Sequence, residues 1–316
     1  MRREDRVSLF GAIEAGGTKF VCGLGTGPQD LRLTTFPTST PANTLDKVID
    51  YFRKEAGAKL DAVGIGAFGP VDLRPESPTF GFITSTPKGD WQQFDLAGTL
   101  QRELDVPIGF DTDVNAAAAG EARWGAGRGI PDFVYLTVGT GIGGGAMVNG
   151  ELIHGLLHPE MGHIRIPHLP EDPFPGKCPY HKDCLEGLAS GPAMEARWGT
   201  PAPQLASDHP AWNLEARYLA MGLASWVCTL SPERILLGGG VMQQKLLFPM
   251  IRRELLSLLN GYIRVPAILD RMDSFVVPPE LGTRAGVLGA LVLAEHIYRN
   301  PSARIGVPLA GADAWR

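Results

Sequence analysis

The sequence predicts an α/β fold built from two similar halves. Two glycine-rich turns each follow an apolar run: residues 11–19 read Gly-Ala-Ile-Glu-Ala-Gly-Gly-Thr-Lys, and residues 138–145 read Val-Gly-Thr-Gly-Ile-Gly-Gly-Gly. A further apolar segment follows each turn, so each turn is predicted to join the two strands of a hairpin. Because the hairpin and the β/α units behind it occur twice, we expect a duplicated fold with a cleft between its halves.

The first half is predicted to alternate between strands and helices. Residues 7–36 read as three strands around the first glycine turn. Apolar residues at helical spacing predict a helix from Thr44 to Ala56, with its N-cap at Asn43 or Thr44. The segments expected to follow are a buried strand (60–66), a helix (96–104), a short strand (107–110) and an alanine-rich helix (113–124).

The second half restarts with a strand and hairpin at Phe133. Behind them we expect a long helix (214–230), a strand (234–237) that runs into Gly238-Gly-Gly240, and two more helices (246–259 and 283–298). The last helix has a face of small residues, which allows another element to pack closely against it. These residues are Ala285, Gly286, Gly289 and Ala290.

Both glycine turns nearly match better-known phosphate motifs, and both matches fail. Residues 11–18 resemble a P-loop, but Gly17 stands where the lysine is required. Residues 139–144 satisfy G-x-G-x-x-G, yet that dinucleotide motif requires a helix to begin at its third glycine. Here the chain continues to Asn149-Gly150, a hairpin turn signal. Since such turns expose backbone N–H groups to a polyanion, the pair favours ATP as the ligand.

Composition excludes several classes of function. The chain has 316 residues, of which 44% are hydrophobic and 20% charged, so it is long enough for two domains with a substantial core. Its net charge of −5 and the lack of a Lys/Arg run argue against a nucleic-acid partner. No apolar stretch approaches the length of a membrane span. The four cysteines and the lack of a signal peptide indicate a reducing, cytoplasmic location.

A cluster of metal-binding residue types lies in the second half. His163, Cys178, His181 and Cys184 have gaps of two residues between the last three, which lets one loop surround Zn²⁺, while the distant histidine ties that loop to another element. With four protein ligands the site would be closed, so we expect structural zinc. The acids Glu160 and Glu186 flank the loop and could accept hydrogen bonds from the hydroxyls of a polyol.

Four segments together resemble the signature of the ROK sugar kinases, members of the actin/hexokinase/Hsp70-like ATPase superfamily. They are Glu160-Met-Gly-His163, the Cys/His loop, Leu185-Glu186 and Ser190-Gly-Pro-Ala193. The resemblance covers residues 9–297 and implies a two-lobed, ribonuclease H-like duplicated ATPase fold. It implies a small N-terminal lobe (1–117 with 289–301) for sugar and phosphate, and a large C-terminal lobe (118–288) for the nucleotide and the zinc loop. Residues 302–316 form a tail without periodicity, as is typical of disordered segments.

Further residues resemble the fructokinase subgroup of this family. They are Glu14 in the first turn, Thr112 before Asp113, Ser85-Thr-Pro-Lys88, and His181 in place of a cysteine, whereas Gly89-Asp90-Trp91 departs from the Pro-Gly-Trp of that subgroup. The resemblance implies ATP-dependent phosphorylation of D-fructose to fructose 6-phosphate. A mannokinase or glucokinase of the same family is the alternative. A sugar-sensing ROK transcription regulator would carry a helix-turn-helix domain ahead of the first turn, where this sequence has only about ten residues.

The resemblance also implies roles for individual residues. Asp113 is expected to accept the proton of the primary hydroxyl, although from the residues alone a helix N-cap is the better interpretation. Glu14 is expected to hold Mg²⁺ through water. His163 would use one ring nitrogen for zinc and the other for sugar. The expected sugar contacts are Thr112, Asp113, Glu160, His163 and Glu186.

The nucleotide is expected to contact residues in four places. The phosphates are assigned to Gly16, Gly17, Thr18 and Lys19 and to Thr140, Gly141 and Gly143, and the adenosine to Pro192 and to Gly238, Gly239, Gly240, Val241 and Met242. The cofactors implied are Mg-ATP and structural zinc. As family members are often dimers, we expect a homodimer, with sugar and ATP as its small-molecule partners and neither nucleic acid nor membrane.

Overall fold

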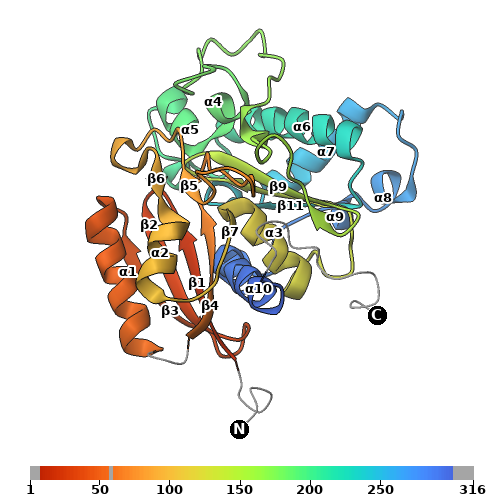
Figure 1. Cartoon of the computed structure of the whole chain (residues 1–316). Coiled ribbons are helices and arrows are strands. Elements are labelled where there is room, and N and C mark those ends of the chain that lie inside the picture. Colours follow the sequence, from red (N-terminus) through yellow and green to blue (C-terminus); the bar gives the residue numbers. More distant parts are fainter. Residues whose placement is uncertain (1–7, 57–59, 302–316) are drawn as a thin grey trace. The chain divides into compact units, whose positions relative to one another are not determined.

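A computed structural model of the chain describes residues 8–56 and 60–301, so the expected tail at 302–316 lies outside the described residues. The chain divides into two compact units (Figure 1). The first contains the described residues up to Arg128, together with Gly150–His158 and those from Thr283 onward. The second contains Gly129–Asn149 and Pro159–Gly282. Within the part of the chain that is described, no helix has the length and apolar character that a membrane crossing requires.

The unit boundaries differ from the expected lobe boundaries, which fell inside two helices. The units instead keep helices α3 (Asp113–Trp124) and α10 (Ala285–Arg299) whole. A helix forms cooperatively because successive turns share hydrogen bonds, so a division between compact units avoids its interior.

The first unit is built on a five-stranded sheet in the order β3-β2-β1-β4-β7. Strands β1 and β2 form an antiparallel hairpin around the first glycine turn, as predicted, and β4 and β7 add in parallel. A two-stranded sheet of β5 and β6 lies in the same unit. The strands of this unit are β1 (Leu9–Ala15), β2 (Lys19–Gly25), β3 (Arg32–Pro37), β4 (Leu60–Ala67), β5 (Phe82–Ile83), β6 (Phe94–Asp95), β7 (Ile108–Thr112) and β10 (Glu151–Leu152).

Helices α1 (Pro41–Glu55) and α2 (Leu96–Leu104) pack together on one side of this sheet, and α3 and α10 pack together on the other (Figure 1). Helix α1 begins earlier than predicted, because Thr40 rather than Asn43 or Thr44 is its N-cap. The hydroxyl of Thr40 accepts a hydrogen bond from the backbone N–H of Asn43, and Pro41 occupies the first turn, where no N–H is needed.

The second unit repeats the arrangement of the first. Its strands β9, β8, β11 and β12 are neighbours in that order, with an antiparallel β8–β9 hairpin and parallel pairing of β8 with β11 and of β11 with β12. The same order and directions occur in β2, β1, β4 and β7. The predicted duplication is therefore confirmed. These strands are β8 (Phe133–Val138), β9 (Ile142–Val148), β11 (Arg234–Gly238) and β12 (Val276–Val277).

The helices of the second unit include the two long ones that the sequence predicted. The α-helices of this unit are α4 (Leu185–Ala189), α5 (Gly191–Trp198), α6 (Ala211–Leu230), α7 (Leu247–Leu259), α8 (Pro266–Leu269) and α9 (Met272–Phe275). Short 3₁₀ helices occur at η4 (Met161–His163), η5 (Ala202–Gln204) and η6 (Val241–Gln243) in this unit, at η3 (Gly89–Trp91) in the first unit, and at η7 (Gly282–Arg284), where the chain passes from the second unit to the first. The long helices α6 and α7 pack against each other.

The small face of α10 packs closely, as predicted. A Cβ atom on Gly289 would lie 1.5 Å from the carbonyl oxygen of Ala116 in α3, and one on Gly64 in β4 would lie 1.8 Å from the carbonyl oxygen of Ala290. Neither position has room for any side chain, because the neighbouring atom is backbone and cannot rotate away. Glycine at these two positions lets α10 pack directly against the backbones of α3 and β4.

Candidate active site

In the first unit, three chain segments leave the sheet at the same edge. Ala15, Ala67 and Thr112 pair in register across the parallel strands β1, β4 and β7. The first glycine turn, the segment after β4 and the start of α3 therefore begin side by side. The carboxyl ends of parallel strands are where ligands bind in open α/β sheets.

The first glycine turn is held as a hairpin turn. The N–H of Gly16 donates to the carbonyl oxygen of Lys19 at 3.0 Å, and a Cβ on Gly16 would lie 2.8 Å from that oxygen. Thr38, which directly follows β3, stabilises the turn with two hydrogen bonds. Its N–H donates to Thr18 O at 2.9 Å, and its hydroxyl donates to Gly16 O at 2.7 Å. No helix follows Thr18, so rejection of the P-loop is confirmed.

Glu14 comes one residue before β1 ends, and its carboxylate is short of hydrogen-bond partners. Its Oε2 is shielded from solvent and has no hydrogen-bond partner among the residues described. The backbone N–H of Val287, in the first turn of α10, bonds to the carboxylate, and Lys19 lies near. Burial raises the pKa of Glu14 above its ordinary value despite these two contacts. A bound cation would satisfy the unpartnered oxygen, so Glu14 fits a magnesium ligand, directly or through water.

Asp113 is the first residue of α3, and it is not the N-cap. Thr112 takes that position: its hydroxyl accepts the N–H of Asn115 at 3.1 Å. Asp113 is half-buried, and its Oδ1 accepts the N–H of Val114 at 2.9 Å. The interpretation of Asp113 as a mere helix cap is therefore wrong, because the neighbouring threonine already performs the capping.

A buried aspartate and its half-buried histidine partner, next to Asp113, escaped sequence analysis. Asp111 is 1% exposed, and its Oδ1 accepts the N–H of Thr112 at 2.7 Å and the side-chain N–H of Asn115 at 2.8 Å. Its Oδ2 lies 2.8 Å from Nε2 of His154. Burial lowers the pKa of His154, but the hydrogen bond and charge of Asp111 outweigh burial and raise it above its ordinary value. Asp111 thus fixes the backbone at the start of α3, where Thr112 and Asp113 lie.

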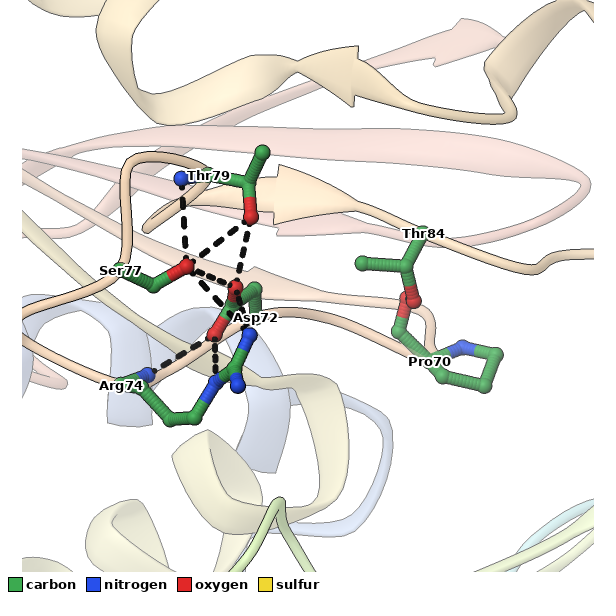
Figure 2. Close-up of polar contacts among 6 residues, drawn as sticks. All are labelled: Pro70, Asp72, Arg74, Ser77, Thr79 and Thr84. Carbon is green, nitrogen blue, oxygen red and sulfur yellow. Dashed lines mark hydrogen bonds and ion pairs between the residues drawn. The ribbon is translucent and has the colours of Figure 1, made fainter.

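The segment after β4 is held by another buried carboxylate (Figure 2). Asp72, 1% exposed, accepts hydrogen bonds from the guanidinium of Arg74 and from the hydroxyls of Ser77 and Thr79. The Arg74 hydrogen bond is the main reason that the pKa of Asp72 lies well below its ordinary value. Nearby, the hydroxyl and N–H of Thr84 both donate to the carbonyl oxygen of Pro70. These bonds fix the path of the chain from β4 to β5 and just beyond it.

In the second unit, the second glycine turn meets two other predicted nucleotide-binding segments. Gly139 N–H donates to Gly141 O at 2.8 Å, and Gly191 N–H, at the start of α5, donates to Gly139 O at 2.8 Å. Gly239 has φ 96° and a Cβ there would lie 2.3 Å from Val138 O, so only glycine fits.

The remaining predicted nucleotide-binding residues are placed on the same few elements. Thr140 lies in the turn, Gly143 on β9 and Gly238 at the end of β11. Gly143 and Gly238 pair with Thr137 of β8 from its two sides. Pro192 lies in the first turn of α5, and Gly240 is followed by Val241 and Met242 in η6. The predicted β8–β9 hairpin is confirmed, which excludes the dinucleotide motif.

Glu186 and Glu160 are close enough to interact. Oε2 of Glu186, on α4, accepts the N–H of Ile142 at 2.9 Å and so touches the end of the second glycine turn. Glu160 immediately precedes η4. Partial desolvation of its carboxylate, and then the negative charge of Glu186, raise the pKa of Glu160 to about 7. A carboxyl group with such a pKa suits hydrogen bonding to hydroxyls, because Glu160 accepts when ionised and can donate when protonated.

The four predicted metal ligands lie together. The ligand atoms of His163, Cys178, His181 and Cys184 all lie within 4.8 Å of one another. Nδ1 of His163 is 3.7 Å from Sγ of Cys178 and 3.6 Å from Sγ of Cys184. A tetrahedral zinc ion, with Zn–S of about 2.3 Å and Zn–N of about 2.0–2.1 Å, separates S and N by about 3.6 Å. The residues therefore fit a four-coordinate ion.

The second nitrogen of His163 points to Glu186. Nε2 lies 4.0 Å from Oε1 of Glu186, while Nδ1 faces the two sulfurs. The predicted division of labour between the two ring nitrogens is thus geometrically feasible. The metal ligands, both acids and the second glycine turn are thus connected by contacts that all lie within the second unit.

Comparison with known proteins agrees with this geometry. Residues 10–297 match the ROK family. The chain belongs to the ROK family. Fructokinases of Pediococcus pentosaceus and Lactococcus lactis are 42% and 43% identical to it, over 92% of this chain and 99% and 98% of theirs.

Two solved ROK structures have the same fold. A ROK hexokinase of Thermus thermophilus has a TM-score of 0.72 at 30% identity and covers 91% of this chain and 98% of its own. A ROK glucokinase of Streptomyces griseus, solved with glucose and AMPPNP, has a TM-score of 0.71 at 26% identity and covers 91% and 99%. The ROK member described here therefore has the two-lobed, actin-like ATPase fold that its sequence predicted.

Proposed function

We propose that this ROK protein is a fructokinase, which transfers the terminal phosphoryl group of ATP to the primary hydroxyl of fructose and releases fructose 6-phosphate. The observation that carries the proposal is its similarity to fructokinases over nearly their whole length. The site adds physical support, because two glycine turns, a poorly satisfied carboxylate and an acid beside a capped helix are the groups that phosphoryl transfer needs.

In this proposal the two glycine turns bind the nucleotide phosphates. Backbone N–H groups of Gly16–Lys19 and of Thr140–Gly143 would donate to phosphate oxygens, and Gly238–Met242 with Pro192 would contact the adenosine. Glu14 would hold the magnesium ion, which when bound neutralises charge on the phosphates. Phosphoryl transfer depends mainly on such positioning and charge neutralisation, so few side chains need to react.

Asp113 is proposed as the base. Thr112 rather than Asp113 caps α3, and the carboxylate of Asp113 would accept the proton of the sugar hydroxyl as the phosphoryl group arrives. Asp111 and its partner His154 act on Asp113 only through the backbone, by fixing the N–H of Thr112. The sugar hydroxyls would be bound by Thr112, Glu160, Glu186 and Nε2 of His163.

The metal cluster is proposed to hold structural zinc. Four ligands leave no position for a reacting water, so the ion would stiffen the loop rather than take part in chemistry. By anchoring Nδ1 of His163, it would fix the ring so that Nε2 can only face the sugar side. Zinc would thus act on the reaction through the orientation of one imidazole.

The test is a coupled assay of ADP release with a panel of hexoses. We expect fructose to give the highest kcat/KM, ahead of mannose and glucose, and the purified protein to elute as a homodimer on size-exclusion chromatography. Asp113→Asn should still bind fructose but lose about 100- to 10,000-fold in kcat. Asp105→Asn is the matched control, since Asp105 is exposed at the end of α2 in a left-handed conformation that asparagine tolerates. Near-normal turnover of the Asp113 variant would refute the assignment.

A further inference from the structure

Lys88, which ends the Ser85-Thr-Pro-Lys88 segment that resembles the fructokinase subgroup, lies against the first glycine turn. Gly17 stands where a P-loop has its lysine, and a Cβ atom on Gly17 would lie 3.2 Å from Cε of Lys88 and 3.9 Å from its Cδ. The end of the Lys88 side chain thus runs along the backbone of the turn. Lys88 comes 71 residues after Gly17 in the chain, and it adds a second cation to the turn, which ends in Lys19.

The segment that carries Lys88 is fastened to the protein on both sides. Before it, Thr84 is bonded to Pro70 at the end of the β4 segment (Figure 2). After it, the N–H of Trp91 donates to the carbonyl oxygen of Lys88 at 2.9 Å. Within it, Thr86 is 1% exposed, and its hydroxyl lies 3.4 Å from the N–H of Lys88.

Trp91 connects this segment to the glycine turn itself. Its indole is 1% exposed and packs on Phe20 with ring centroids 5.4 Å apart, and Phe20 directly follows Lys19 in the same hairpin. The indole N–H donates to Ser39 O at 2.8 Å, and the neighbouring Thr38 is the residue that binds Gly16 and Thr18. Trp91 and the turn are therefore parts of one rigid arrangement, which fixes the backbone of Lys88 relative to the turn.

The ammonium of Lys88 forms no ion pair with an acid among the described residues. The side chain is exposed, and the described part of the chain gives it no ion pair. An exposed lysine that only solubilises the surface would extend into water. This one instead lies over a glycine whose N–H group can approach an anion.

We propose that the ammonium of Lys88 binds the phosphoryl group that is transferred, in the role that the lysine within the turn plays in P-loop enzymes. The inference rests on the proposed function and deepens it by adding a cation to the phosphate site. The backbone N–H groups of the turn are neutral donors, and a cation adds charge stabilisation where negative charge spreads over the phosphoryl oxygens. In this role Lys88 exchanges no proton with the substrates.

The variants Lys88→Met and Lys88→Arg test the proposal in the full-length protein. Lys88→Met keeps the aliphatic chain but removes the charge, and should lower kcat/KM for ATP by about 100-fold. Lys88→Arg should recover part of the loss, because a guanidinium also binds phosphate. The matched control is Lys47→Met, an exposed lysine on α1 with no atom within 4 Å of a Cβ on Gly16 or Gly17. Thermal unfolding should be unchanged in all three.

Binding measurements separate a phosphate role from a sugar role. For Lys88→Met we expect the Kd of a non-hydrolysable ATP analogue to rise about tenfold, while the Kd values of ADP and fructose stay as in the wild type. Loss of fructose affinity with unchanged nucleotide affinity would overturn the proposal, and so would a Lys88→Met enzyme as active as the control. A wild-type protein that phosphorylates no hexose would instead refute the proposed function, and the nucleotide measurement would still decide on Lys88.

Discussion

Two glycines on α10, three residues apart, should respond in opposite ways to the same substitution. At Gly286 a Cβ atom would lie 2.6 Å from Cδ of Glu14 and 2.9 Å from its Oε2, so it would strike the free end of a side chain. At Gly289 a Cβ atom would lie 1.5 Å from Ala116 O, which is backbone. We therefore expect Gly286→Ala to fold and lose activity, and Gly289→Ala to lose the fold.

The size of each effect follows from these contacts. Carbon atoms prefer separations of about 3.5–4.0 Å, so the carboxylate of Glu14 must move by about 1 Å to accept a methyl group on Gly286. Replacing glycine by alanine in a helix returns up to about 1 kcal/mol, which offsets part of the overpacking cost of about 1–3 kcal/mol. Stability should thus change little, whereas a misplacement of about 1 Å can lower the rate about 100-fold. A methyl group on Gly289 would require the backbone of α3 to move, and no gain in stability offsets the cost of that movement.

Thermal unfolding and magnesium titration of the kinase reaction measure the two effects. For Gly286→Ala we expect a melting temperature within a few degrees of the wild type, a higher magnesium requirement and a kcat about 100-fold lower. Glu14→Gln should resemble it in activity, which provides an independent check. If Gly286→Ala turned over normally at wild-type magnesium concentrations, the carboxylate of Glu14 would have no part in holding the metal, and our reasoning would be refuted.

Three further outcomes follow from other buried groups. Cys184→Ser should abolish binding of about one equivalent of zinc and lower the melting temperature, whereas the exposed Cys228→Ser should do neither; metal analysis of both variants decides this. Asp72→Asn should destabilise the protein by about 1–2 kcal/mol at pH 7. Because the pKa of Asp72 is lowered on folding, that difference is full above about pH 4 and shrinks as the pH falls further, which urea unfolding at several pH values would show. Glu215→Gln should be as stable as the wild type near pH 4 and more stable at pH 8, by about 1 kcal/mol or more. Burial raises the pKa of Glu215 well above its ordinary value, so ionisation of the wild-type acid opposes folding as the pH rises. Equal urea midpoints of the two proteins at pH 8 would contradict this.

The fold was largely predictable because its signals are local. The two hairpins are marked by glycine turns between apolar runs, and α2 and α3 have the predicted bounds. The start of α1 was misjudged, since the first large apolar residue of the helix, Leu45, comes a full turn after the helix begins at Pro41. Periodicity detects the buried face of a helix and not its first turn. The Thr40-Pro41 pair was the better signal.

The site was predictable where its residues share a motif and hidden where they meet across the chain. The metal ligands lie within 22 residues of sequence, and spacing alone identified them. By contrast His154 meets Asp111 across 43 residues, and Lys88 meets Gly17 across a larger separation. No local pattern links such pairs, because the sheet register and the tryptophan anchor bring them together. Gly286 likewise read as a packing residue, and its contact with Glu14 needed the fold.

Buried carboxylates in this protein differ in a way that separates structure from function. Each carboxylate oxygen of Asp72 and of Asp111 has at least one hydrogen-bond partner in its own unit, so these two acids stabilise loops. Both oxygens of Glu215 lack hydrogen-bond partners among the described residues, but full burial favours the neutral acid, and a neutral acid binds no cation.

Glu14 lies between these cases. One oxygen is unpartnered, yet Lys19 and the N–H of Val287 both favour its ionised form. Such a carboxylate has a raised pKa and lacks one positive partner. A divalent cation binds the ionised form, so its binding should weaken as the pH falls, which separates a functional acid from a merely buried one.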